Sequence, residues 1–427
     1  MIRLIEGWDL DWFEAWTGRL KAQEEAAACV RAIVEDVRRE GHAAVARYTW
    51  KLDGVSLPPE SFRVGEGELK VAREAVNPQV LLALRRAKEN IIEYHRRQLP
   101  QSWFMADKSG NILGQICQPL RRVGIYIPGG TAAYPSSVLM TALPAKVAGV
   151  EEIVLVTPPR PDGSIHPLVL VAALEAGVTE IYKMGGAQAI AALAYGTEYV
   201  RPVDKIVGPG NIYVTLAKKE VYGQVDIDML AGPSEIVVVA DRSARPDWVA
   251  ADLLSQAEHD TLAGSVLITP ERSLAEAVIE ELDMQLKVLP RASIASQALE
   301  NYGAAIVVKD LHEALDKANI LAPEHLELYV SEPWRWVGMV HNAGAIFLGP
   351  YSPEPVGDYL AGPSHVLPTG GTGRFYSGLS IDTFIKKSSV IAYHHQGLLE
   401  IAREVEELAR AEGLEAHARA ITLRMQD

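Results

Sequence analysis

From about residue 122 onward, segments typical of buried β-strands alternate with segments typical of helices. The first strands are predicted at residues 122–127, 152–156, 180–184 and 205–207, with helices at 136–148, 167–176 and 187–195. A second series begins at 235–240 and continues at 265–269, 305–308, 326–330 and 345–348. Such alternation predicts parallel sheets covered by helices, here in two α/β units at about 122–234 and 235–380.

The two ends of the chain have a different, helical pattern. Residues 21–40 place Ala, Val and Ile at helical spacing and end at Gly41, and residues 80–97 form a similar segment. Residues 396–412 form an amphipathic helix with an apolar stripe that includes Leu399 and Leu408. This stripe must be covered, either by the chain itself or across a dimer.

Length and charge restrict the class of protein. A chain of 427 residues is too long for one core and suggests two or three structural units. The net charge of −14 argues against nucleic-acid binding, which needs clustered Lys and Arg. No segment reaches the roughly 18 apolar residues that span a bilayer, and acidic residues interrupt the N-terminus where a signal peptide would be apolar. We therefore expect a cytoplasmic protein that does not bind membranes.

Gln256 and His259 form the first candidate metal pair. They stand three residues apart near the end of a predicted helix, so both side chains can reach one ion. A His at this position is more often a partner of the helix dipole, and Gln is a weak ligand. Metal binding here would need anionic and imidazole groups from elsewhere in the chain. The two cysteines, Cys29 and Cys117, exclude a four-cysteine zinc site within one chain.

Glu324 and His325 form a candidate acid/base pair at the end of a helix-to-strand connection. The competing interpretation is a surface pair without a role. Adjacent residues in a strand point to opposite faces, so both reach one substrate only if the backbone is irregular there.

Three further acidic or imidazole side chains lie in the Pro- and Gly-rich loop at 353–365, namely Glu354, Asp358 and His365. Each could point inward, although long loops are also commonly simple connections. Glu412 and His417 follow at the end of the C-terminal helix, where a His would usually be a surface residue.

Three glycine-rich turns end predicted strands, at residues 126–130, 185–188 and 208–211. Such turns let the backbone approach a phosphate at a helix N-terminus and fit a ligand cleft at the carboxyl ends of parallel strands. None is a G-x-G-x-x-G motif, so they indicate a dinucleotide only weakly.

Taken together, these segments resemble the histidinol dehydrogenase family from about residue 20 to Arg424. The motifs that carry the resemblance are YIPGG at 126–130, GGAQAIAAL at 185–193, DKIVGPGN at 204–211, AGPSE at 231–235, LLSQAEHD at 253–260, APEHLEL at 322–328, SPEPVGDYLAGPSHVLPTGG at 352–371 and EGLEAHARAITLR at 412–424. Several long motifs in one order are more specific than any single signature.

The resemblance implies a role for each candidate residue. The zinc ligands, for one ion per subunit, would be Gln256, His259, Asp358 and His417. Glu324 and His325 would be the acid/base residues. The substrate contacts would be Ser234, Gln256, His259, His325, Asp358, Glu412 and His417. The NAD contacts would be Tyr126, Gln188 and Asn211.

The resemblance also implies an α/β fold of two incomplete Rossmann-like domains with small helical terminal segments. The expected boundaries are a helical segment at 1–24, a first domain from 25–125 and 236–380 with the metal and acid/base residues, a second domain at 126–235 with the NAD contacts, and a helical segment at 381–427. The family implies an intertwined homodimer in which this last segment completes the partner's active site.

The activity so implied is oxidation of L-histidinol to L-histidine through histidinaldehyde, with two NAD⁺, as the last step of histidine biosynthesis. One related group acts on a sulfonated diol, but EHLEL at 324–328 and EGLEAH at 412–417 resemble the histidinol branch. Two other classes remain open at this point: a zinc hydrolase and a metal-binding scaffold without catalysis. The metal could also be manganese or cobalt. A thiolate mechanism through Cys117 is disfavoured, because no His or cluster of cations lies near it in sequence.

Overall fold

The structure, a computed structural model, describes residues 2–18, 24–129 and 133–426. It contains two compact units, the first formed by Met1–Gln98 and Leu120–Phe384, the second by Leu99–Pro119 and Ile385–Asp427. Gly130 of the predicted turn at 126–130 and the start of the helix predicted at 21–40 lie outside the described residues. Among the described residues, no helix has the length and apolar character needed to cross a membrane.

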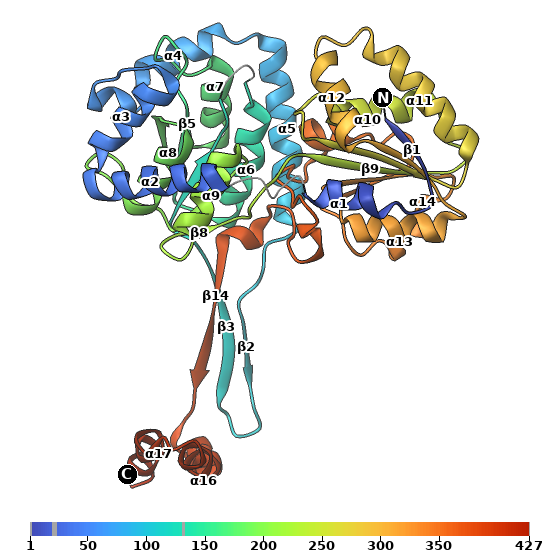
Figure 1. Ribbon diagram of the computed structural model, residues 1–427. Coiled ribbons are helices and arrows are strands. Elements are labelled where there is room, and N and C mark those ends of the chain that lie inside the picture. The colour runs from blue at the N-terminus through green and yellow to red at the C-terminus, as the bar shows by residue number, and fades with distance from the viewer. Residues whose placement is uncertain (1, 19–23, 130–132, 427) are drawn as a thin grey trace. The chain divides into compact units, whose positions relative to one another are not determined.

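The first unit contains a six-stranded parallel sheet (Figure 1). Its strands, in spatial order, are β1 (Arg3–Glu6), β11 (Ala304–Val307), β10 (Gly264–Thr269), β9 (Glu235–Ala240), β12 (His325–Tyr329) and β13 (Ala345–Leu348). Every residue of β9 is buried. Alternate residues of this strand enter two different hydrophobic cores, because successive side chains in a strand point to opposite faces.

Helices cover both faces of this sheet, as Figure 1 shows. Ile236 and Val238 pack against one layer of helices, formed by α10 (Pro246–Ala257), α11 (Arg272–Leu286) and α12 (Ala292–Tyr302). Val237 and Val239 pack on the other face, against α1 (Leu10–Gly18) and α13 (Leu311–Leu321). Burial on both faces explains why the strand consists entirely of apolar residues after Glu235.

A second, five-stranded parallel sheet lies in the same unit. Its strands, in spatial order, are β6 (Glu180–Lys183), β5 (Glu152–Thr157), β4 (Arg122–Tyr126), β7 (Lys205–Val207) and β8 (Asp226–Ile227). Its helices between strands are α6 (Pro135–Ala148), α7 (Pro167–Ala176), α8 (Gly186–Tyr195) and α9 (Ile212–Val221). Without β1, the first sheet has the same order of strands along the chain, so both are five-stranded versions of the Rossmann arrangement. The predicted fold class is confirmed.

The structure differs from the expected domain boundaries in the N-terminal region. Residues 3–6 form strand β1, which pairs with β11, although a helical segment was predicted at 1–24. Four helices, α2 (Glu24–Glu40), α3 (His42–Asp53), α4 (Glu66–Ala75) and α5 (Pro78–Arg96), pack against α6–α9 of the second sheet. The resemblance placed residues 25–125 with the metal-binding domain, whereas these helices contact the helices of the second sheet; the domain boundaries themselves stay a prediction. An amphipathic pattern predicts that a helix buries one face, but not which sheet that face contacts.

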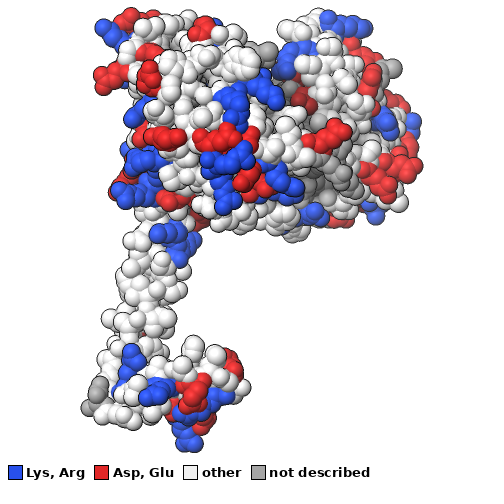
Figure 2. Space-filling model, turned by 60° about the vertical axis from the view of Figure 1, so that its left-hand side comes forward, with Lys and Arg blue, Asp and Glu red and all other residues white. Residues whose placement is uncertain are grey.

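The second unit combines an antiparallel ribbon with two helices. The ribbon is formed by β2 (Trp103–Ala106), β3 (Ile112–Pro119) and β14 (Ile385–Ala392), so the C-terminal segment predicted as helical begins with a strand. Figure 2 shows little charge along the ribbon, whereas acidic and basic side chains are interspersed on the face of the first unit in view. Helices α16 (His395–Ala411) and α17 (Glu415–Thr422) pack on each other. Leu399 and Leu408 of the predicted apolar stripe stay exposed.

Candidate active site

A cavity of about 1070 Å³ opens in the first unit between the two sheets. On one side it is lined by residues that follow strands of the second sheet, including Pro128, Gly210 and Asn211. On the other side it is lined by residues at the amino ends of β9 and β12, including Ser234 and His325. The cavity therefore lies at the carboxyl edge of the second sheet, where open α/β sheets bind ligands, and it meets the amino edge of the first.

His325 is the first residue of β12 and is only 3% exposed. Its Nδ1 lies 3.0 Å from the backbone oxygen of Glu235. A carbonyl oxygen can only accept, so Nδ1 carries the hydrogen and Nε2 has a free lone pair. Nε2 is buried and has no hydrogen-bond partner among the described residues. Burial lowers the pKa of His325 to about 4, with smaller contributions from His259 and His365, so the ring is neutral at physiological pH.

Glu324 directly precedes β12 and lies outside the regular alternation of the strand. Ala322 before it has φ of +46°, a left-handed conformation that turns the backbone between α13 and β12. This irregular connection lets Glu324 and His325 both line the cavity. The Glu324 carboxylate accepts a hydrogen bond from the backbone N–H of Glu235 at 3.0 Å. The N–H and C=O groups of one residue of β9 thus hold both members of the predicted pair.

The pKa of Glu324 is raised well above its usual value. Burial is the largest cause, and the negative charges of Glu235, Asp358 and Glu354 add to it. A buried carboxyl group of this kind is poised to exchange a proton, and perturbed groups in a cavity are typical of active sites.

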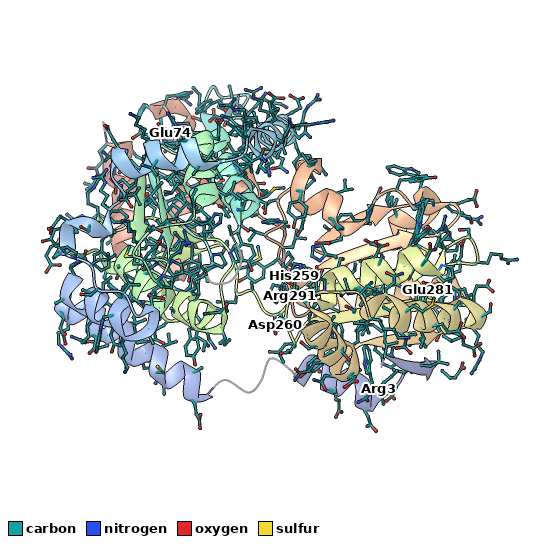
Figure 3. The ribbon with its side chains drawn as sticks, turned by 90° about the horizontal axis from the view of Figure 1, so that it is seen from above. Arg3, Glu74, His259, Asp260, Glu281 and Arg291 are labelled. Atoms are coloured by element: carbon teal, nitrogen blue, oxygen red, sulfur yellow. The ribbon has the colours of Figure 1, made fainter. Side chains whose placement is uncertain are left out.

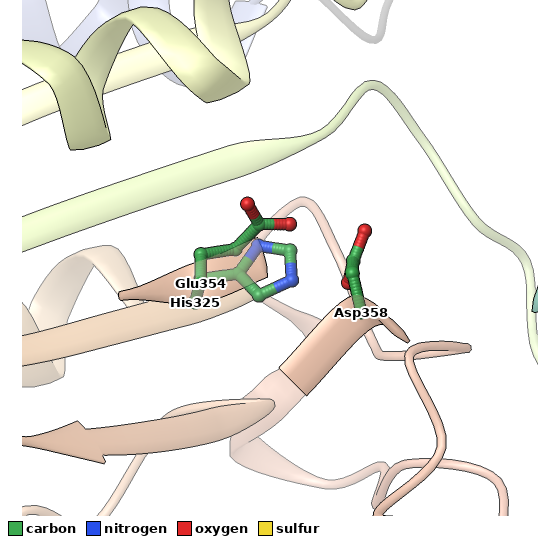
Figure 4. A group of neighbouring side chains, drawn as sticks. All are labelled: His325, Glu354 and Asp358. Atoms are coloured by element: carbon green, nitrogen blue, oxygen red, sulfur yellow. The ribbon is translucent and has the colours of Figure 1, made fainter. Parts of the chain in front are cut away.

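A cluster of side chains that could hold a metal ion lines the same cavity (Figure 4). Candidate ligand atoms of His325, Glu354 and Asp358 all lie within 4.8 Å of one another. Glu354 lies in the short helix α15 (Glu354–Val356), and Asp358 in the following helical turn η3 (Gly357–Ala361). Burial raises the pKa of Asp358 to about 6, and burial together with Asp358 raises that of Glu354 to about 8. Two buried carboxyl groups this close favour a cation between them.

The predicted pair Gln256 and His259 lines the cavity beside this cluster. Gln256 lies in the last turn of α10 and is 1% exposed, and its Oε1 has no hydrogen-bond partner among the described residues. The backbone oxygen of His259 accepts a hydrogen bond from Arg291, and Figure 3 shows the two residues close together with Asp260. His259 lines the same cavity as Glu354 and His325. A buried oxygen without a partner and two buried carboxyl groups fit a metal ion.

The three predicted NAD contacts have different surroundings. Asn211 lines the cavity, and its Oδ1 caps α9 by accepting the N–H groups of Tyr213 and Val214 at 3.1 and 3.2 Å. Tyr126 and Gln188 are buried and do not line the cavity. The Tyr126 hydroxyl accepts the N–H of Gly186 at 3.1 Å, and burial raises its pKa to about 12. The contacts of all three with NAD stay predictions.

Glu412 and His417 belong to the second unit, at the end of α16 and in α17, and are not part of the cavity described in the first unit. Their roles stay predictions. Cys117 is in β3 of the same unit and contacts the backbone oxygen of Gln101 at 3.6 Å.

Three residues of the site were absent from the predicted ligand and catalytic sets, namely Glu354, Glu235 and His365. Glu354 shares the cluster with Asp358, and the spacing of four residues between them was the available signal. Glu235 contributes through its backbone, which no pattern of side chains reveals. His365 has its Nε2 3.1 Å from the Ser137 hydroxyl and its Nδ1 3.7 Å from Asp358, so it joins the two sides of the cavity.

Two Rossmann-like sheets facing one cavity, with a buried acid/base pair and a cluster of side chains that could hold a metal ion, are the features of an α/β dehydrogenase. The family model described as histidinol dehydrogenase matches residues 18–425. The chain belongs to the histidinol dehydrogenase family, whose members are NAD-dependent oxidoreductases of histidine biosynthesis.

The similarity to individual relatives extends over the whole chain. A histidinol dehydrogenase of Moorella thermoacetica is 69% identical over 99% of this chain and 100% of its own length. One of Heliobacterium mobile is 55% identical over 100% of both chains. The crystal structure of histidinol dehydrogenase from Elizabethkingia anophelis superposes with a TM-score of 0.94 at 38% identity, over 100% of this chain and 98% of that one. These matches favour the histidinol branch over the alternatives of a hydrolase or another polar alcohol.

Proposed function

We propose that the cavity of the first unit oxidises L-histidinol to L-histidine in two steps with two NAD⁺. The observation that carries this proposal is the hydrogen bonding of the His325 ring, which fixes its tautomer. Its Nδ1 donates to the Glu235 carbonyl, its Nε2 has no hydrogen-bond partner among the described residues, and Glu324 stands next to it on the same cavity wall. The neutral imidazole of His325 can act as the base that takes a proton from the alcohol. The neighbouring Glu324 carboxylate can act as the base that takes a proton from water.

In the first step, His325 Nε2 accepts the hydroxyl proton while hydride leaves the carbinol carbon. Because Nδ1 remains bonded to the Glu235 oxygen, the ring keeps its orientation as it becomes charged. In the second step, ionised Glu324 accepts a proton from the water that adds to the aldehyde. Hydride then leaves the hydrate, and the carboxylic acid forms.

The residues that would hold one zinc ion per subunit are Gln256, His259, Asp358 and the partner subunit's His417. Bound zinc would supply Lewis-acid binding of the nitrogen atoms of the substrate and has no redox role. The unpartnered Gln256 Oε1 and the raised pKa values of Asp358 and Glu354 support a cation at this place. Ser234 would contact the substrate from the amino end of β9.

The homodimer is part of the same proposal. The exposed apolar residues Leu399, Ile401 and Leu408 of α16 would be covered by a second copy, and the partner subunit's Glu412 would contact the substrate. A cytoplasmic location stays a prediction.

A turnover assay with L-histidinol tests the proposal directly. The purified protein is given limiting histidinol and excess NAD⁺, and the NADH formed per histidinol is counted by absorbance. Two NADH per histidinol are expected, with loss of activity after chelation and recovery on adding zinc. One NADH per histidinol would contradict the second oxidation. Hydrolysis of a substrate without NADH would favour a zinc hydrolase.

A further inference from the structure

A buried ion pair lies beneath the second sheet's side of the cavity. Lys218 of α9 and Asp228, which follows β8, have side chains that are only 3% and 1% exposed, and Lys218 Nζ contacts Asp228 Oδ1. Neither residue lines the cavity. The proposed reaction uses neither of them, so a charged pair in this position has no role yet.

The ion pair makes hydrogen bonds to both the backbone N–H and the backbone C=O of Gly208, in the neighbouring turn. Asp228 Oδ2 accepts the N–H of Gly208 at 2.7 Å, and Lys218 Nζ donates to the Gly208 carbonyl oxygen at 3.1 Å. Asp228 Oδ1 also accepts the N–H of Met229 at 2.6 Å. Because the N–H and the C=O of Gly208 have separate charged partners, the plane of each flanking peptide is fixed.

Gly208 begins the turn at 208–211, which forms part of the cavity wall. Its φ of +108° is accessible to glycine, and a Cβ here would lie 2.3 Å from the Tyr126 backbone oxygen. Pro209, Gly210 and Asn211 then line the cavity. The described residues provide no hydrogen-bond acceptor for the N–H groups of Gly210 and Asn211, which stand at the start of α9. Such free N–H groups suit a phosphate.

Stability alone does not explain the pair. Removing two charges from water costs about as much as their attraction returns, and well-packed apolar residues are commonly as stable. What apolar residues cannot do is hold the two polar groups of Gly208 in one orientation. The effect of the pair is therefore on the geometry of the turn.

We propose that Lys218 and Asp228 are positioning residues for the dinucleotide, holding the turn at 208–211 in the conformation that receives the phosphates of NAD⁺. The inference rests on the proposed function, because it needs NAD⁺ to bind at this cavity. It predicts that loss of the pair weakens NAD⁺ binding without impairing the metal site or the substrate contacts, which are proposed on the first sheet's side of the cavity and in the C-terminal segment of the partner subunit.

The test compares three variants of the zinc-loaded enzyme. Lys218→Met combined with Asp228→Asn removes both charges together, so no lone charge is left buried. Lys205→Met is the matched control. Lys205 pairs with Asp226 at 2.7 Å across the same two strands, β7 and β8, but at the amino end of β7, away from the cavity. Asn211→Ala tests whether NAD⁺ uses the turn at all.

The double variant should raise the KM for NAD⁺ by about tenfold or more, the scale expected when a binding turn loses its preorganisation. Its kcat at saturating NAD⁺, its KM for histidinol and its zinc content should stay near those of the parent. Lys205→Met should leave all four quantities unchanged. Lys218→Arg, which keeps both charges but changes the donor geometry at the Gly208 carbonyl, is the variant to use if the double variant folds poorly, and it should give an intermediate KM for NAD⁺.

Two results overturn the inference in distinguishable ways. If Asn211→Ala raises the KM for NAD⁺ but the double variant only lowers thermal stability, the pair is structural and the cofactor site stands. If neither variant changes the KM for NAD⁺, the cofactor does not bind at this turn, and the proposed position of NAD⁺ fails together with the inference.

Discussion

The protonation of His325 permits a quantitative test of the site, through the replacement His325→Asn. Burial lowers the pKa of this imidazole from 6.5 to about 4 in the folded protein. Above pH 6.5 the ring is neutral in both states and contributes no pH dependence. Between these values the unfolded chain binds a proton that the folded chain cannot accept, so the free energy of unfolding falls as the pH falls. At about 1.4 kcal/mol per pH unit, the full loss is about 3 kcal/mol.

Urea unfolding of the chelated parent and variant, at several values from about pH 7 to about pH 4.5, measures this loss. Asn can still donate to the Glu235 oxygen but does not titrate. The parent should therefore lose about 2.5 kcal/mol more than the variant over this range. His341→Asn, at an exposed imidazole, is the control and should run parallel to the parent. Parallel curves for the parent and His325→Asn would refute the reasoning, since they would mean that the imidazole titrates equally in both states.

Three other substitutions test the remaining parts of the site and fold. Glu324→Gln should stop the reaction at the aldehyde, giving one NADH per histidinol. Because the Glu324 pKa is raised, the rate of the parent's second step should increase as the pH rises through that pKa. If the second step of the variant kept the same pH dependence, Glu324 would not be its base. Gln256→Leu should lower zinc affinity by about tenfold or more in equilibrium dialysis, and full zinc retention would exclude Gln256 as a ligand. Leu253→Ala, at a fully buried residue of the helix that carries Gln256, should lower the free energy of unfolding by about 3 kcal/mol in urea; a loss below about 1 kcal/mol would contradict its place in the core.

The α/β fold could be predicted from the sequence to a large extent. The strand predicted at 235–240 is β9 as observed, and the strand predicted at 122–127 differs from β4 by one residue. These strands are buried on both faces, so their apolar character is continuous and is visible locally. Helices α2 and α5 were also predicted, at 21–40 and 80–97, but the sheet that they cover was not. Which sheet a helix covers depends on contacts between residues far apart in the chain.

In the candidate site, too, the sequence predicts which residues take part, whereas the fold decides how they are held. The sequence singled out Glu324, His325 and Gln256 by their chemistry and spacing, and it left Asp358 as one of several loop candidates. The family resemblance then implied that Gln256 and Asp358 are zinc ligands. Only the tertiary structure decided that the Glu235 backbone holds both members of the pair, because this requires β9 and β12 to lie side by side in one register. It also placed Glu354 beside Asp358. Side-chain types and local periodicity are written in the sequence, whereas the tautomer of an imidazole or the pKa of a carboxyl group depends on neighbours brought together by folding.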